Sequence, residues 1–174
     1  MTTFSLVIHV IAAAALVGPQ LVLFLAVIPA TWLIPEERLR RDVTRVVTAR
    51  FGMLAGVSLV LLVATGLYQF FAGVPNDVRD NLSDYRFGSI FMVKMLFFVI
   101  FIVLLAVHTV VIGRRVRRLS DRLIANQGDE EAEFALESQR RLSFVLSFFM
   151  LLTAFFVLAL GVMLGDHNYA YELR

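Results

Sequence analysis

The stretch Gly88–Ile112, GSIFMVKMLFFVIFIVLLAVHTVVI, decides the fold, because Lys94 is its one charged residue. A helix rises about 1.5 Å per residue, so roughly 20 apolar residues cross about 30 Å of hydrocarbon, and this run is longer. Three more apolar runs reach that length, at Phe4–Ile34, Phe51–Ala72 and Leu142–Gly165. The sequence therefore predicts an all-α integral membrane protein, an antiparallel four-helix bundle that forms a single domain over residues 1–174.

The composition supports membrane insertion and excludes several classes of protein. Of the 174 residues, 59% are hydrophobic, and the mean hydropathy is +0.80. A water-soluble body of this size cannot bury so much apolar surface, so the lipid bilayer must cover it. The chain has no cysteine, which excludes disulfides, thiolate metal sites and cysteine nucleophiles. No phosphate-binding loop or zinc-protease motif is found, and we expect no nucleic-acid partner.

The arginines are concentrated in two of the three connections between the apolar runs. The first connection contains Arg38, Arg40, Arg41, Arg45 and Arg50. The third contains Arg114, Arg115, Arg117, Arg118, Arg122, Arg140 and Arg141. The second, Val74–Phe87, carries more acidic than basic residues. Because Lys and Arg accumulate on the cytoplasmic side, we predict that the first and third connections are cytoplasmic and that both termini lie outside, most simply in a bacterial inner membrane.

Two local signals predict that helices extend beyond the apolar runs. Pro35 followed by Glu36 and Glu37 is typical of a helix start, because Pro suits the first turn and acids suit its positive end. Residues 126–129, Asn-Gln-Gly-Asp, predict a turn in which Gly128 ends one helix and Asp129 caps the next. The third and fourth helices should therefore continue as an antiparallel cytoplasmic hairpin. Its predicted contacts pair Val116, Leu119 and Leu123 with Phe134 and Leu136.

Polar side chains inside the apolar runs mark candidate functional sites, because they are rare and costly in a membrane. His9 and Gln20 fall on one face of the first helix, and Lys94 and His108 share a face of the third. The topology predicts one outer layer that contains His9, Tyr68, Gln69, Met92, Lys94, Met95, Met163, Asp166 and His167. His108 and Gln20 are secondary polar sites, further from the outer face. Each of these side chains could instead bind a neighbouring helix or reach the headgroups, with no ligand involved.

The residue types in this outer layer suit two cofactors. Imidazole and thioether donors bind the soft ion Cu(I), which predicts a metal site from His9, His167 and Met163. Two imidazoles on different helices could instead hold the iron of haem b, with Lys94 pairing with a propionate and Tyr68 closing the layer. We expect a haem- or copper-binding protein of electron transfer or metal handling, rather than an enzyme acting by itself.

Two other functions stay open. The chain could be a non-catalytic accessory subunit of a larger respiratory or transport complex, or a homo-oligomer. Its polar groups would then join helices, and its arginine-rich hairpin would dock a partner. It could also be an enzyme acting on a lipid or a quinone, with Lys94 and Tyr68 as the polar groups of its site.

Three segments resemble the CopD-like family of membrane proteins, named for copper resistance protein D. They are HVIAAAALVGPQLVLFLAVIPA from His9, with Gly18 inside it and Pro29 ending the helix; ATG at Ala64–Gly66; and FGSIFMVKMLFF through Lys94. The resemblance covers most of the chain. This resemblance implies copper handling at the outer face.

His9 and Lys94 are also similar to the first-helix histidine and third-helix lysine of the HemJ family, a haem-associated protoporphyrinogen oxidase. This more distant resemblance implies haem b. Ala15 and Leu16 stand where a Trp usually follows the histidine, and a Gly-Pro-Gln step replaces the aromatic-rich continuation. These departures argue against protoporphyrinogen oxidase activity.

Overall fold

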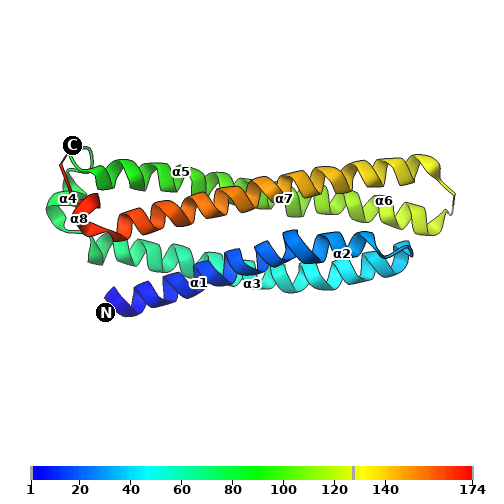
Figure 1. Cartoon of the computed structure of the whole chain (residues 1–174), viewed down its shortest axis with the longest axis horizontal. Coiled ribbons are helices and arrows are strands. Elements are labelled where there is room, and N and C mark those ends of the chain that lie inside the picture. Colours follow the sequence, from blue (N-terminus) through cyan, green and yellow to red (C-terminus); the bar gives the residue numbers. More distant parts are fainter. Residues whose placement is uncertain (1, 127, 174) are drawn as a thin grey trace. The chain divides into compact units, whose positions relative to one another are not determined.

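The computed structural model describes residues 2–126 and 128–173, and within them the fold is all-α (Figure 1). Most of the chain forms long helical stretches, some of which consist of consecutive elements, with η marking a π-helical segment. The elements of these stretches are α1 (Thr2–Val22), η1 (Leu23–Val27), α2 (Ile28–Trp32), α3 (Glu37–Gly73), α5 (Arg86–Ala106), η2 (Val107–Ile112), α6 (Gly113–Ala125) and α7 (Glu130–Gly165). Two short helices complete the chain, α4 (Asn76–Asp80) and α8 (His167–Ala170). No strand forms in the described residues, although Tyr85 and Leu173 make an isolated antiparallel bridge.

Four helical stretches are long and apolar enough to cross a membrane: Thr3–Trp32, Glu37–Gly73, Arg86–Ala125 and Glu130–Gly165. Even in the most buried of them, only 28% of the apolar window lies inside the structure, so most of the hydrophobic surface faces outward. Such an extensive apolar surface is stable in lipid and is a liability in water. The prediction of an all-α chain with four helices of membrane-spanning length is confirmed, and these helices indicate an integral membrane protein.

The chain divides into two compact units, and each long stretch contributes residues to both. The terminal unit contains the residues up to Val17, Leu54–Phe101 and the residues from Thr153 on. The hairpin unit contains Gly18–Met53 and Ile102–Leu152. The arginine-rich connections and the predicted outer layer therefore belong to different units.

Aromatic contacts join the helices of the terminal unit. Phe70 of α3 stacks on Phe91 of α5 with ring centroids 4.8 Å apart. Phe97 of α5 contacts Phe156 of α7 at 4.5 Å. The short helices α4 and α8 lie side by side in this unit (Figure 1), where Val78 of α4 is buried with residues around α8 in one hydrophobic cluster.

Side chains of the C-terminal segment contact the start of α5. Arg86 forms an ion pair with Glu172, and its guanidinium lies 5.1 Å from the ring centroid of Tyr169. The ring of Phe87 contacts that of Tyr171 at 5.8 Å. Ion pairing, a cation–π contact and ring packing therefore hold the chain end against this unit.

In the hairpin unit, α3 begins at Glu37, as the Pro-Glu-Glu signal predicts. The amide of Arg40 donates to the Glu36 carbonyl at 2.9 Å, which starts the helical hydrogen bonds. The Arg40 side chain reaches back, and its Nε donates to the Ile34 carbonyl at 3.1 Å and its Nη2 to that of Trp32 at 3.3 Å. One side chain thus satisfies carbonyls that the end of α2 leaves without helical partners.

The turn between α6 and α7 follows the predicted chemistry. Gly128 has a φ of 90°, in the left-handed region that favours glycine, and it follows the end of α6. Oδ1 of Asp129 accepts a hydrogen bond from the amide of Ala132 at 2.9 Å, which confirms Asp129 as the cap of α7. Gln127, the other predicted turn residue, lies outside the described residues.

The predicted contact of Phe134 with α6 is wrong. Phe134 is 81% exposed, whereas Leu136 is only 1% exposed. Two successive helical steps rotate a side chain by about 200°, so residues two apart cannot face the same neighbour. Ala132, one turn before Leu136, is equally buried and marks the face of α7 that packs inward.

The predicted end of the first helix at Pro29 is also wrong, because the helix continues to Trp32. Just before the proline, in η1, the amide of Ile28 bonds to the carbonyl of Leu23, five residues earlier. The hydrogen-bond register therefore shifts at the point where Pro29 has no N–H to offer. Leu33 and Ile34, which belong to the predicted apolar run, fall outside the helix.

Candidate functional site

His9 on α1 is hydrogen-bonded across the terminal unit to α3. Its Nδ1 lies 2.7 Å from Oγ1 of Thr65, which is itself buried. The Thr65 hydroxyl has a single hydrogen, and Oγ1 lies 2.5 Å from the Leu61 carbonyl, to which it donates. Oγ1 must then accept from Nδ1–H of His9. The imidazole is therefore protonated at Nδ1, and its Nε2 carries a free lone pair.

Lys94 on α5 belongs to the same unit and lies beside α7. A methyl group added at Gly161 of α7 would come within 3.5 Å of Lys94 Nζ. A methyl group added at Gly66, next to Thr65, would come within 3.5 Å of Cε1 of His9. The His9 ring and the end of the Lys94 side chain thus each lie beside a glycine, and all four long stretches contribute a residue to these two contacts.

Other residues of the predicted outer layer lie at the surface of this unit. Tyr68, Met92 and Met163 are exposed. Gln69 donates through Nε2 to the Ser5 carbonyl at 3.4 Å, which joins α3 to α1 near the start of the chain. The structure therefore joins His9 to Thr65, while Met163 and Tyr68 are partly exposed and, among the residues that the structure describes, form no hydrogen bond with either.

His167 has a different environment from His9. It is exposed in α8, and its ring stacks on that of Tyr171 with centroids 4.9 Å apart. Asp166 ends the α7 stretch and accepts at Oδ1 from the amide of Tyr169. His167 lies beyond the end of α7 at Gly165, in the separate helix α8, whereas Lys94 lies beside Gly161 within α7. No hydrogen bond or ring contact joins His9 to His167 in the described part of the chain.

The hairpin unit contains the two secondary polar residues. His108 lies in η2, and its Nε2 is 2.9 Å from Oγ of Ser143 and 3.2 Å from Oγ of Ser147, both on α7. Gln20 is only 6% exposed, and neither polar atom of its side chain has a partner among the described residues. Nε2 of His108 thus joins η2 to α7, whereas Gln20 is a buried amide without a hydrogen bond among the described residues.

An ion-pair cluster in the hairpin unit was not foreseen from the sequence. Nη2 of Arg140 lies 2.8 Å from both carboxylate oxygens of Glu37, and Ser120 donates its hydroxyl to Glu37 Oε1 at 2.6 Å. Arg41 pairs with Asp121 at 2.5 Å. The sequence indicates this cluster only in part, because Glu37 signals the start of a helix and Arg140 marks the cytoplasmic side.

The residues that sequence reasoning missed in the terminal unit are Thr65, Gly66 and Gly161. Thr65 and Gly66 fall within the short ATG segment that carries the CopD-like resemblance, which is the one signal that pointed to them. Gly161 has no such signal, because its importance is the space it leaves beside Lys94.

Neither the arrangement of metal-ligating side chains nor similarity to known proteins identifies a function. Within the described ranges, no group of three or more His, Cys, Asp or Glu side chains is arranged to hold a metal ion. No family model, curated protein or solved structure matches the chain. The functional interpretation therefore depends on the geometry around His9 and Lys94.

Proposed function

We propose that this chain is a membrane-embedded electron-transfer protein that binds haem b in its terminal unit, where Nε2 of His9 would hold the iron. The observation that carries the proposal is the hydrogen bond from Nδ1–H of His9 to Thr65. Histidines that bind metals usually donate their other ring N–H to a neighbouring acceptor, which fixes the tautomer and the ring orientation. When bound, haem b supplies one-electron transfer.

The surrounding residues fit such a group. Lys94 supplies a cation for a carboxylate such as a propionate, and the absence of a side chain at Gly66 and Gly161 lets the His9 ring and the Lys94 chain lie against α3 and α7. Phe97 and Phe156 add aromatic surface in the same unit. The copper alternative is less well supported, because Cu(I) needs several soft donors, while Met163 is exposed and His167 stacks on Tyr171.

The experiment is the optical spectrum of the purified protein in detergent. We expect a Soret band that is lost in His9→Ala and retained in His108→Ala, a matched control because that histidine is satisfied by two serines. Thr65→Val removes the acceptor for Nδ1–H and should weaken haem affinity by roughly 10- to 100-fold. Elution as a single species on size-exclusion chromatography shows that each variant is folded.

Other spectra would lead to other conclusions. A spectrum unchanged by His9→Ala would refute ligation by His9, and a comparable loss in His167→Ala would indicate two histidine ligands. A colourless protein with stoichiometric copper would favour copper handling. A colourless, metal-free protein would favour the accessory-subunit role, in which the His9–Thr65 hydrogen bond only joins α1 to α3.

The same proposal includes an orientation, with the termini and the haem on the outer side and the arginine-rich connections in the cytoplasm. It is supported by the arginine distribution. Alkaline phosphatase fused to the C-terminus should be active in a bacterial host, and the same enzyme inserted at Gly128 should be inactive. The opposite pattern would reverse every assignment of side.

A further inference from the structure

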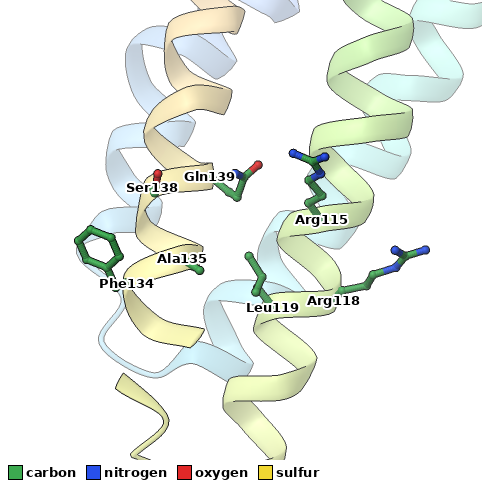
Figure 2. A pocket seen from close by; sticks show the side chains of 7 residues that line it. All are labelled: Arg115, Arg118, Leu119, Phe134, Ala135, Ser138 and Gln139. Atoms are coloured by element: carbon green, nitrogen blue, oxygen red, sulfur yellow. The ribbon is translucent and has the colours of Figure 1, made fainter. Parts of the chain in front are cut away.

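A groove of about 450 Å³ lies in the hairpin unit, between α6 and α7 (Figure 2). Its lining residues are Arg115, Arg118, Leu119, Phe134, Ala135, Ser138 and Gln139. In Figure 2, Arg115 of α6 and Gln139 of α7 face each other, and Leu119 and Ala135 point into the gap between the same helices. The groove thus combines a cationic group, an amide and an apolar floor.

The polar groups of this groove lack protein partners. Arg115 and Arg118 make no ion pair or hydrogen bond in the described part of the chain, whereas Arg41, Arg122 and Arg140 of the same unit each contact a carboxylate. Oε1 of Gln139 is buried and accepts no hydrogen bond from any described residue. The groove therefore offers the free guanidinium group of Arg115 and one unused acceptor, and the free guanidinium group of Arg118 extends from its edge, away from α7 in Figure 2.

The position of the groove along the chain indicates which anion would reach it. Gly113 begins α6 directly after the apolar run, and Arg115 and Arg118 are three and six residues past Ile112. This corresponds to about 4.5 and 9 Å along a helix axis, the depth of the phosphate layer if the run spans the bilayer. Clusters of arginine immediately after a membrane-spanning helix attract anionic lipid headgroups, and guanidinium matches phosphate geometry.

We propose that this groove binds the headgroup of an anionic phospholipid that carries a hydroxyl, as phosphatidylglycerol does. Arg115 and Arg118 bind the phosphate, and Oε1 of Gln139 accepts a hydrogen bond from the headgroup hydroxyl. The carbon atoms of the headgroup lie on Leu119 and Ala135. The proposal depends on the membrane placement described above, and it does not depend on haem.

The first test measures binding of a fluorescent phosphatidylglycerol to the purified protein in detergent micelles. Arg115→Gln/Arg118→Gln removes two charged hydrogen-bond donors and should weaken binding by at least about tenfold. The matched control is Arg114→Gln/Arg117→Gln, which removes the same charge from the same turns but changes no lining residue, and should weaken binding by less than about threefold. Equal losses in the two variants would overturn the groove in favour of diffuse attraction to the arginine cluster.

The second test addresses the hydroxyl and the source of the phosphate. Wild-type protein should prefer phosphatidylglycerol to phosphatidylmethanol, which has the same charge and no headgroup hydroxyl, and Gln139→Leu should remove that preference. Equal binding of both lipids by the wild type would overturn the role of Gln139. Displacement of the lipid by glycerol phosphate at the same concentration as by competing phosphatidylglycerol would overturn the lipid assignment and indicate a soluble ligand.

Discussion

Replacing Arg140 by glutamine should destabilise the protein far more than the same replacement at its neighbour Arg141. Arg140 contacts both oxygens of Glu37 at 2.8 Å, and the two side chains are only 19% and 17% exposed. In Arg140→Gln the charged Glu37 carboxylate loses its ion pair and keeps the hydrogen bond from the Ser120 hydroxyl. Hydrogen bonds to charged groups contribute about 1.5–3 kcal/mol, and breaking a fully buried pair costs roughly 3–5 kcal/mol. We expect a loss of about 2–4 kcal/mol.

Arg141→Gln is the matched control. Arg141 pairs with Glu137 at 3.5 Å within one helix, and these side chains are 81% and 53% exposed, so the loss should stay below about 0.5 kcal/mol. The assay is the free energy of unfolding measured by SDS titration in mixed micelles. The double variant Glu37→Gln/Arg140→Gln leaves no unpaired charge and should recover part of the loss. Equal stability of the two single variants would refute the conclusion that the Glu37–Arg140 ion pair stabilises the hairpin unit more than the exposed Glu137–Arg141 pair does.

Three further outcomes follow from the packing. Leu136→Ala should cost about 2–4 kcal/mol of unfolding free energy in the same assay, while Phe134→Ala should change it by less than about 0.5 kcal/mol. Gly88→Ala would drive a methyl group into the backbone carbonyl of Leu82 and should lower the midpoint of thermal unfolding. Gly161→Ala would make an ordinary 3.5 Å contact with Lys94 and should leave that midpoint unchanged. Burial raises the pKa of Tyr171 above its ordinary value near 10, so the folded state holds that proton more tightly; stability should fall as the pH rises past about 10, and Tyr171→Phe should reduce this fall in alkaline titrations.

The helices were predictable because their determinants are local. Apolar runs longer than a bilayer, the acids after Pro35, and the Gly128-Asp129 pair each act within a few residues of the structure they specify. The wrong contact predicted for Phe134 has the same origin, because local sequence gives the depth of a residue along a hairpin but not its rotation about the helix axis. Leu136 and Phe134 lie at similar depth, but only one of them can face α6.

The partners across the bundle were not predictable, because they depend on how the helices are rotated and shifted against each other. The arrangement of His9 beside Thr65, and of Lys94 beside Gly161, requires the register of α1 on α3 and of α5 on α7. Their positions along the predicted membrane helices place His9 and His167 in one outer layer. The structure ends α7 before His167 and places that ring on Tyr171.

The hydrogen bonds of His9 and His108 distinguish these two histidines, whereas their depths along the helices do not. Nε2 of His108 lies 2.9 Å from Oγ of Ser143 and 3.2 Å from Oγ of Ser147. In His108 it is therefore Nε2, the nitrogen furthest from the backbone, that is committed to α7. In His9 it is Nδ1 that is hydrogen-bonded, to Thr65, and Nε2 has no hydrogen-bond partner among the described residues. A ligand outside the helix can reach Nε2 more readily than Nδ1, so of these two histidines only His9 is prepared to bind one.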